Sequence, residues 1–204
     1  MITIIDYGIG NVGSIKNMLK KVGAKSQITG DLNEIEKADK LILPGVGSFD
    51  FGMTQLKNNN LTSILNQKVL VEKKPILGIC LGMQLLTKGS EEGKEAGLGW
   101  INATTLKFKF EDDINLKVPH MGWNNIEIKK DSRLLRDLPI PSKFYFVHSY
   151  YVKCEDASNS ILSSTYGHEF TCGIEKENIL GVQFHPEKSH KFGMRILKNF
   201  SELY

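Results

Sequence analysis

The stretch PILGICLGMQLLTKG (residues 75–89) decides how this chain folds. Residues 75–79 are a short apolar run that predicts a buried strand, and residues 81–89 predict a helix that begins directly after Cys80. Small residues on both sides of the cysteine, among them Gly78 and Gly82, permit a sharp strand-to-helix turn. Such a turn holds the central side chain in a strained, exposed position at the carboxyl end of a sheet.

The same alternation extends toward the N-terminus. Residues 2–6 (ITIID) and 40–44 (KLILP) are further apolar runs that predict buried strands. Asn11 can cap an intervening helix that Gly23 ends, and two more helical stretches follow near 50–58 and 60–73. This order predicts an α/β fold with a mainly parallel central sheet flanked by helices.

Short β-like runs dominate the second half of the chain. Gly, Asn, Asp and Pro punctuate them, which predicts additional antiparallel strands. The runs are residues 103–110, 125–129, 143–153, 161–166, 170–175 and 179–184. The C-terminal residues 189–204 are amphipathic at helical spacing. No repeat or long linker divides the chain, so we expect a single domain over residues 1–204.

Composition excludes several classes of protein. The 204 residues carry a net charge of only +3, which implies no nucleic-acid partner. No stretch approaches the roughly 20 apolar residues that a membrane helix needs. Cys80, Cys154 and Cys172 are odd in number and widely spaced, which argues against a disulfide framework and a zinc site. We therefore expect a cytoplasmic location, no membrane partner and no metal.

Cys80 is the first candidate for chemistry. The N-terminus of the following helix is expected to favour its thiolate. The backbone N–H of Leu81 is well placed to donate to a tetrahedral oxyanion. The alternative interpretation of this GxCxG pattern is a buried structural cysteine, which is the commoner fate of a cysteine.

A second candidate is the FHPE segment (residues 184–187), which follows an apolar strand. A thiol nucleophile needs a base, and the pKa of histidine lies near neutrality, so His185 fits that task. Glu187 can hold the imidazole in the correct tautomer. A solvated surface turn is the alternative, but together with the elbow at Cys80 the pair favours a Cys-His-Glu triad.

The third candidate is the loop 44–47 (PGVG), at the end of the second predicted strand. Glycine on both sides of Val46 gives a backbone whose N–H groups can point into a site. Open α/β sheets bind ligands at this carboxyl edge. A plain tight turn is the alternative.

Together these motifs resemble class I (triad) glutamine amidotransferases. More closely, the chain is similar to the family of glutaminase subunits that serve imidazole glycerol phosphate synthase. The resemblance spans nearly the whole chain. It is carried by DYGIGN (6–11), LPGVGSF (43–49), GICLGMQLL (78–86), PHMGWN (119–124), YFVHSYY (145–151) and GVQFHPEKS (181–189). PHMGWN and YFVHSYY separate this family from other triad amidotransferases.

The resemblance implies a role for each matching position. Cys80 would be the nucleophile, His185 the general base and acid, and Glu187 its orienting partner. The oxyanion hole would comprise Gly45, Val46, Gly47 and Leu81, after a peptide flip in the 44–47 loop driven by the partner. Glutamine would be bound by Gln84, Glu92, His148, Ser149 and Tyr150, with Glu92 at the α-ammonium and the 149–150 backbone at the α-carboxylate.

The resemblance also implies a protein partner. Its interface would lie near Pro119, His120, Met121, Gly122, Trp123, Asn124 and Lys188. Bland alternatives exist for several of these residues: Gln84 could be an exposed helix residue, Glu92 lies in a charged run, and Met121 and Trp123 could be plain core.

The reaction implied is hydrolysis of L-glutamine to glutamate and ammonia through a cysteine thioester, without a cofactor. The chain has no P-loop and no GxGxxG fingerprint, so it offers no phosphosugar or nucleotide site of its own. A heterodimeric cyclase partner, a (β/α)₈ barrel, would receive the ammonia and make imidazole glycerol phosphate and AICAR in histidine biosynthesis.

Three other interpretations stay open from the sequence. The segment HPEKSHKFG (185–193) looks more like paralogues that supply ammonia to a cyclase-like partner for sugar amidination in surface-glycan biosynthesis. A catalytically idle binding module on the same fold is a second, and a cysteine hydrolase or peptidase of related architecture is a third. The intact Cys80, His185 and Glu187 argue against the second, and Gln84 has no evident purpose in the third.

Overall fold

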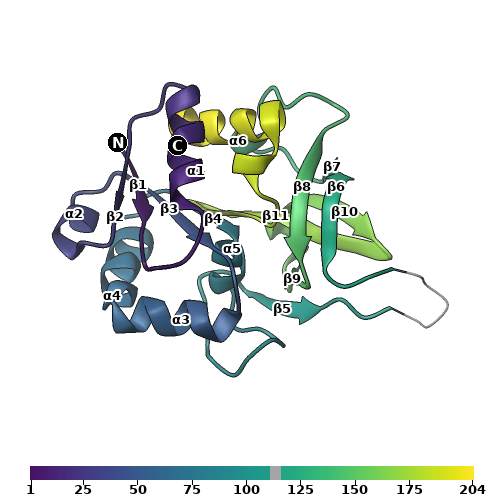
Figure 1. Ribbon diagram of the computed structural model, residues 1–204, viewed down its shortest axis with the longest axis horizontal. Helices are drawn as coiled ribbons and strands as arrows, with labels where there is room; N and C mark the ends of the chain where they lie inside the picture. The colour runs from purple at the N-terminus through teal and green to yellow at the C-terminus, as the bar shows by residue number, and fades with distance from the viewer. Residues whose placement is uncertain (111–115) are drawn as a thin grey trace.

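The computed structural model describes residues 1–110 and 116–204 (Figure 1). Within these ranges a ten-stranded sheet forms the centre of the molecule, in the order β2-β1-β3-β4-β12-β11-β10-β7, with β9 and β5 joined to it through β11. Its strands are β1 (Ile2–Ile5), β2 (Ser26–Thr29), β3 (Lys40–Gly45), β4 (Ile76–Cys80), β5 (Ala103–Lys107), β7 (Glu127–Ile128), β9 (Tyr150–Cys154), β10 (Ser160–Tyr166), β11 (His168–Lys176) and β12 (Ile179–Val182). A separate antiparallel pair comprises β6 (His120–Asn125) and β8 (Lys143–His148).

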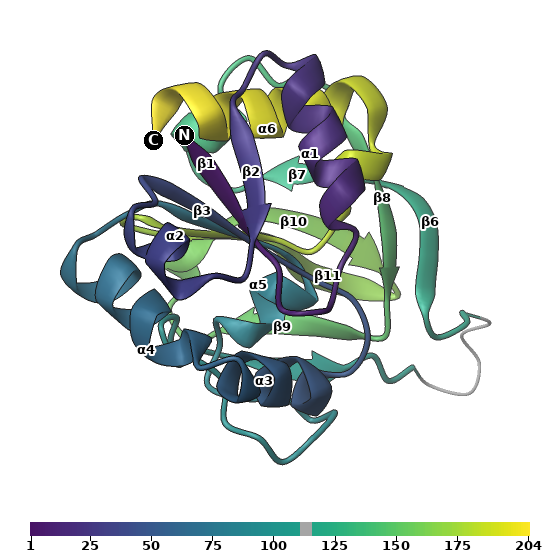
Figure 2. The same cartoon turned by 60° about the vertical axis from the view of Figure 1, so that its left-hand side comes forward.

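Helices cover both faces of the sheet. They are α1 (Val12–Lys21), α2 (Leu32–Glu36), α3 (Phe49–Asn58), α4 (Leu61–Asn66), α5 (Leu81–Leu85) and α6 (His190–Leu203), with short η1 (Gln67–Val71), η2 (Arg133–Leu135), η3 (Ala157–Asn159) and η4 (Pro186–Lys188). Helices α1 and α6 lie together on one face, and α3, α4 and α5 lie on the other (Figure 2). Each face has its own apolar core. Among the described residues no helix is long and apolar enough to cross a membrane.

The sheet has a parallel half and an antiparallel half. Strand β1 runs parallel to β2 and β3, and β4 runs parallel to β3 and β12. From β12 onward the pairing is antiparallel. Strands β1, β4 and β12 are buried along their whole length because helices lie on both sides, which explains their continuous apolar runs. The predicted α/β class, with parallel strands first and antiparallel strands later, is confirmed.

Two predicted helices differ from the structure in length. The helix after Cys80 ends at Leu85 rather than at residue 89, since both the N–H and the hydroxyl of Thr87 bond to the Gln84 carbonyl and turn the chain. The stretch 60–73 divides into α4 and the wider turn η1, where the Glu72 N–H reaches the Gln67 carbonyl five residues back.

Three elements were not expected from the sequence. The edge strand β2 and the helix α2 are short, and no residue of β2 is fully buried. Strand β6 occupies residues 120–125, and the strand expected over 125–129 is reduced to β7. Only His120 is buried in β6, so no apolar alternation marks it in the sequence.

Candidate active site

Cys80 occupies the elbow between β4 and α5. Its φ is +55°, in the left-handed region that residues with a Cβ adopt rarely and at a cost. A Cβ on Gly82 would lie 1.8 Å from the Leu43 carbonyl oxygen, and one on Gly78 would lie 2.7 Å from the Gly82 carbonyl oxygen. Only glycine fits at either position, so the two glycines let the elbow close tightly against β3.

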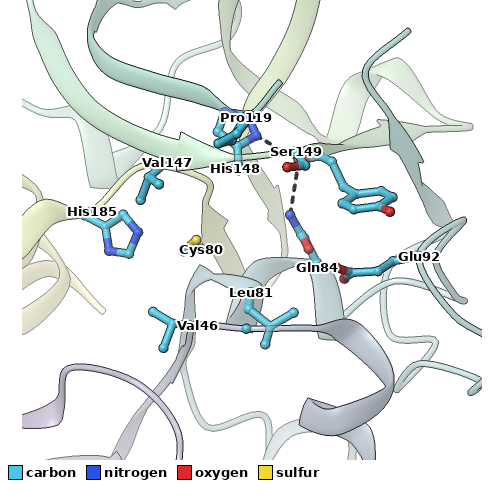
Figure 3. A pocket seen from close by; sticks show the side chains of 12 residues that line it. Val46, Cys80, Leu81, Gln84, Glu92, Pro119, Val147, His148, Ser149 and His185 are labelled. Atoms are coloured by element: carbon cyan, nitrogen blue, oxygen red, sulfur yellow. Dashed lines mark hydrogen bonds between the residues drawn. The ribbon is translucent and has the colours of Figure 1, made fainter. Parts of the chain in front are cut away.

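A pocket of about 300 Å³ opens beside this cysteine (Figure 3). Its walls come from the loop after β3, the elbow, the segment around residue 92, the residue before β6, the β8–β9 junction and the segment after β12. The lining residues are Val46, Gly47, Cys80, Leu81, Gln84, Glu92, Pro119, Val147, His148, Ser149, Tyr150 and His185. Segments far apart in sequence therefore meet at one edge of the sheet, where open α/β folds bind ligands.

His185 and Glu187 form a buried pair beside Cys80. His185 Nδ1 lies 2.8 Å from Glu187 Oε1, and the two side chains are 3% and 1% exposed. The other ring nitrogen, Nε2, is buried and has no hydrogen-bond partner among the described residues. Burial by itself lowers the pKa of His185, but the Cys80 sulfur and the Glu187 carboxylate outweigh it and raise that pKa to about 10. The imidazole can therefore hold a proton next to the sulfur.

An amide network also reaches the sulfur. Gln84 Nε2 donates to the Tyr150 carbonyl at 3.1 Å and to Gln183 Oε1 at 3.0 Å. Gln183 Nε2 then points to Cys80 Sγ at 3.7 Å. The bland interpretation of Gln84 as an exposed helix residue is wrong, because it is only 5% exposed. Sequence reasoning missed Gln183, although a glutamine inside the apolar strand ILGVQF was a usable signal.

Glu92 has a defined position at the rim of the pocket. Its Oε2 accepts a hydrogen bond from the Phe49 N–H at 2.8 Å, at the first turn of α3. Its own N–H donates to Ser90 Oγ at 3.1 Å. A carboxylate is favourable at a helix N-terminus, so these bonds hold the charge in place within an otherwise solvated acidic run.

Of the four backbone positions expected at the oxyanion hole, three line the pocket and one does not. Val46, Gly47 and Leu81 line the pocket. Gly45 packs beneath them: a Cβ there would lie 2.9 Å from both Gly82 N and Leu81 Cβ. The hydroxyl of Tyr7 donates to the Pro44 carbonyl at 2.5 Å, a contact that the sequence did not indicate.

The segment 119–124 divides its side chains between two surfaces. His120 is 3% exposed, whereas Met121 and Trp123 are 62% and 41% exposed, so the suggestion that these two are plain core is wrong. The Trp123 ring stacks on the His190 ring, with centroids 5.4 Å apart. Lys188 lies beside this surface, with its ammonium group over the Tyr145 ring. We call this exposed surface the outer face of β6 and β8.

The other cysteines differ from Cys80 in their surroundings. Cys154 and Cys172 lie outside the pocket, and all three are free thiols. Burial raises the pKa of Cys154 to about 11 and that of Cys172 well above its ordinary value. Neither is suited to act as a thiolate nucleophile. Over the described ranges no cluster of His, Cys, Asp and Glu has the arrangement of a metal site.

Comparison with known proteins identifies the family. The family model described as "Glutamine amidotransferase class-I" matches residues 3–203. The chain therefore belongs to the class-I glutamine amidotransferases. Solved structures with low sequence identity share the fold. PurLQS from Thermotoga maritima has a TM-score of 0.73 at 16% identity and covers 98% of this chain and 96% of its own. A glutamine amidotransferase from the same organism has a TM-score of 0.65 at 19% identity, with coverage of 91% and 75%.

Full-length relatives narrow the assignment. The protein named imidazole glycerol phosphate synthase subunit HisH 2 from Methanococcus maripaludis is 60% identical over 200 residues, 98% of each chain. The HisH 2 protein of Pseudomonas aeruginosa is 50% identical over 203 residues, and the HisH 1 protein of Campylobacter jejuni is 49% identical over 204 residues, each with 100% coverage of both chains. Within the class-I amidotransferases, the chain thus belongs to the HisH subunits.

Proposed function

We propose that this chain is the glutaminase subunit of imidazole glycerol phosphate synthase, which releases ammonia from L-glutamine for a cyclase subunit. The observation that carries the proposal is the meeting, in one pocket, of a strained cysteine, a buried His–Glu pair and groups suited to an α-amino acid. The full-length HisH relatives support the part of the proposal that names the cyclase subunit as the recipient of the ammonia.

Glutamine binds in the orientation that the polar groups favour. Its α-ammonium lies toward the carboxylate of Glu92, and its α-carboxylate lies toward the backbone of Ser149 and Tyr150, all of which line the pocket. Gln84 uses both N–H bonds on Tyr150 and Gln183, so its carbonyl oxygen is the atom left to accept from the substrate. The side-chain amide of glutamine then reaches the sulfur of Cys80.

The chemistry is acyl transfer through a thioester. The Cys80 thiolate attacks the amide carbon, and the oxyanion is stabilised by backbone N–H groups of Leu81 and the 46–47 loop. The C–N bond breaks as His185 protonates the leaving nitrogen, which departs as ammonia. His185 then takes a proton from water, the hydroxide cleaves the thioester, and glutamate leaves. Glu187 holds the imidazole in place throughout.

The partner is a cyclase with a (β/α)₈ barrel that docks on the outer face of β6 and β8. Exposed aromatic and sulfur-containing side chains beside basic groups suit a protein interface, and Met121, Trp123 and Lys188 provide them. Pro119 lines the pocket and directly precedes β6, so ammonia has a short way to the partner. A cytoplasmic location, expected from the free cysteines, completes the proposal.

Sugar amidination in surface-glycan biosynthesis is not favoured as the destination of the ammonia. The full-length relatives are named as subunits of imidazole glycerol phosphate synthase, among them those from Methanococcus maripaludis and Campylobacter jejuni. The glutaminase chemistry would be the same in either case.

Glutamate release by the reconstituted complex tests the proposal. The chain with its cyclase and the cyclase substrate should hydrolyse glutamine, and the chain alone should do so slowly. Cys80→Ala should abolish turnover while cyclase binding is retained. Activity in that variant would contradict the role of Cys80 as nucleophile. If the chain hydrolysed no glutamine with any cyclase subunit of imidazole glycerol phosphate synthase, the proposed function would be wrong.

A further inference from the structure

Two buried histidines face each other across the β6–β8 ladder. His120 and His148 are direct partners in the antiparallel register, and His120 Nδ1 lies 3.0 Å from His148 Nε2. Their side chains are 3% and 6% exposed. The His120 ring is stacked between Tyr166 and Phe146, with centroids 4.1 Å and 4.9 Å away. The catalytic proposal uses neither ring.

The hydrogens in this pair have fixed directions. His148 Nδ1 lies 2.8 Å from the Tyr150 carbonyl, which can only accept, so Nδ1 carries the hydrogen. Burial lowers the pKa of His148 to about 3 and that of His120 to about 4, so both rings are neutral at neutral pH. His148 Nε2 must then accept from His120 Nδ1, and His120 Nε2 accepts from Asn124 Nδ2 at 3.3 Å. The chain of bonds runs one way, from β6 to the Tyr150 carbonyl.

That carbonyl also holds the glutamine pocket in shape. His148 and Gln84 donate to the same oxygen, and Figure 3 shows the two bonds meeting there. Through Gln84 the network continues to Gln183 and ends 3.7 Å from the Cys80 sulfur. A displacement of the Tyr150 carbonyl would therefore reorient Gln84. It would also shift the backbone proposed to bind the α-carboxylate.

Strand β6 connects this network to the outside. His120 and Asn124 point inward, while their neighbours Met121 and Trp123 are exposed on the opposite side of the same strand. Successive side chains of a β-strand point to opposite faces. Because both sets share one backbone, a shift of the strand moves them together. Asn124 is further held by the Thr165 carbonyl at 2.8 Å, so the inner side of β6 is anchored by polar bonds rather than by apolar packing alone.

We propose that His120 and His148 are positioning residues that set the Tyr150 carbonyl, and with it Gln84, from strand β6. The inference rests on the proposed function, because it assigns the two rings to the glutamine site. It adds that the affinity for glutamine depends on where β6 lies, and so on what contacts its outer face. A purely structural histidine pair would stabilise the fold without affecting glutamine binding.

Substitution of His120 in the reconstituted complex separates the two roles. His120→Phe keeps an aromatic ring between its stacking partners but removes the donor to His148 Nε2. Leaving that acceptor unpaired should raise the KM for glutamine roughly tenfold, with a smaller change in kcat. His120→Asn places an amide nitrogen at the same distance from the backbone as Nδ1, so it should restore most of the affinity.

His168→Phe is the matched control. His168 also packs on Phe108 and Tyr151 in this aromatic cluster, yet its buried Nε2 has no hydrogen-bond partner among the described residues. It should leave the KM for glutamine within twofold of the unmodified complex. If His120→Phe does not fold, His120→Gln against His120→Asn repeats the comparison, since glutamine carries its amide beyond the Nδ1 position.

The outcomes distinguish this proposal from the proposed function. Glutamine hydrolysis by the unmodified complex with an unchanged KM in His120→Phe would overturn the positioning role alone. An equal rise in His168→Phe, or no rescue by His120→Asn, would overturn it as well. If the unmodified complex releases no glutamate, the proposed function itself fails.

Discussion

Gly82→Ala tests how tightly the elbow must close for Cys80 to work. The added methyl group would sit 1.8 Å from the Leu43 carbonyl oxygen, 2.9 Å from the Leu43 carbonyl carbon and 3.3 Å from the Pro44 carbonyl carbon. These atoms belong to the backbone of β3, so no side-chain rotation relieves the contact. Because a carbon and an oxygen need more than 3 Å, β3 and the elbow must separate by over an ångström.

The displacement has two consequences of different size. Overpacking of this kind costs about 1–3 kcal/mol, and a backbone obstacle places it at the upper end. For a chain of this length that corresponds to a fall in Tm of roughly 5–10 °C. Strand β3 also leads into the loop of Val46 and Gly47, so an ångström of movement shifts the proposed oxyanion donors relative to Cys80. Misplacement by that distance can reduce turnover by about 10²-fold.

Thermal unfolding and glutamate release by the cyclase complex measure both effects. Gly13→Ala in α1 is the matched control, because its Cβ would meet nothing within 4 Å and alanine favours a helix. It should leave activity unchanged and not lower the Tm. The reasoning is refuted if Gly82→Ala retains the original Tm and turnover, or if Gly13→Ala impairs the complex as strongly.

Three further predictions follow from the site and its surroundings. Glu187→Gln should reduce kcat by about 10²-fold or more, because the lost carboxylate orients His185 and raises its pKa; single-turnover kinetics with glutamine would show a slower thioester step, and an unchanged rate would exclude the orienting role. Trp123→Ala should weaken cyclase binding by roughly tenfold without changing the Tm, and a titration that gives the same Kd would remove Trp123 from the interface. The free energy of unfolding should fall as the pH drops from 6.5 toward 4, by up to about 2.7 kcal/mol per pH unit. In this range the unfolded chain protonates His120 and His148, whereas burial keeps their pKa values near 4 and 3 in the folded chain. Urea unfolding between pH 4 and 7 should show about half that slope in His120→Phe, and an equal slope would contradict the buried neutral state.

The central strands were predictable because a strand that is buried on both faces has a nearly continuous run of apolar residues. Strands β1, β3 and β4 are nearly continuous apolar runs that end at polar or small residues. Helix α1 was also foreseen in position and bounds, since Asn11 accepts from the Ser14 N–H at 3.3 Å and the chain turns at Gly23. In these elements local pattern and tertiary burial agree.

The missed elements depend on contacts that a local pattern does not contain. Strand β2 lies at the edge of the sheet with every residue half-buried, so neither a buried run nor a clean alternation appears. Strand β6 buries a histidine rather than an aliphatic residue, and it is a strand only because β8 pairs with it along its length. Such elements are specified by their partners in the sheet.

The candidate site was predictable where short motifs carry the chemistry and less so where its geometry depends on remote packing. Cys80, His185 and Glu187 stand in compact patterns, and the structure brings them together at one pocket. Gln183 and Tyr7 also stand in the GVQFHPEKS and DYGIGN segments, but neither side chain was assigned a role there. Their importance comes from atoms they meet across the sheet, the Cys80 sulfur and the Pro44 carbonyl.

The segment after Glu187 leads from the Cys80 pocket to the proposed partner interface. His190 lies outside the pocket and stacks flat on Trp123, at an interplanar angle of 2°, on the outer face of β6 and β8. Phe192, two residues on, packs into the core below. A change at His190 therefore alters the outer face of β6 and β8, where we propose that the cyclase docks, whereas a change at Phe192 alters the core. Under that proposal, contacts on this outer face rather than the residues around Cys80 select the acceptor of the ammonia.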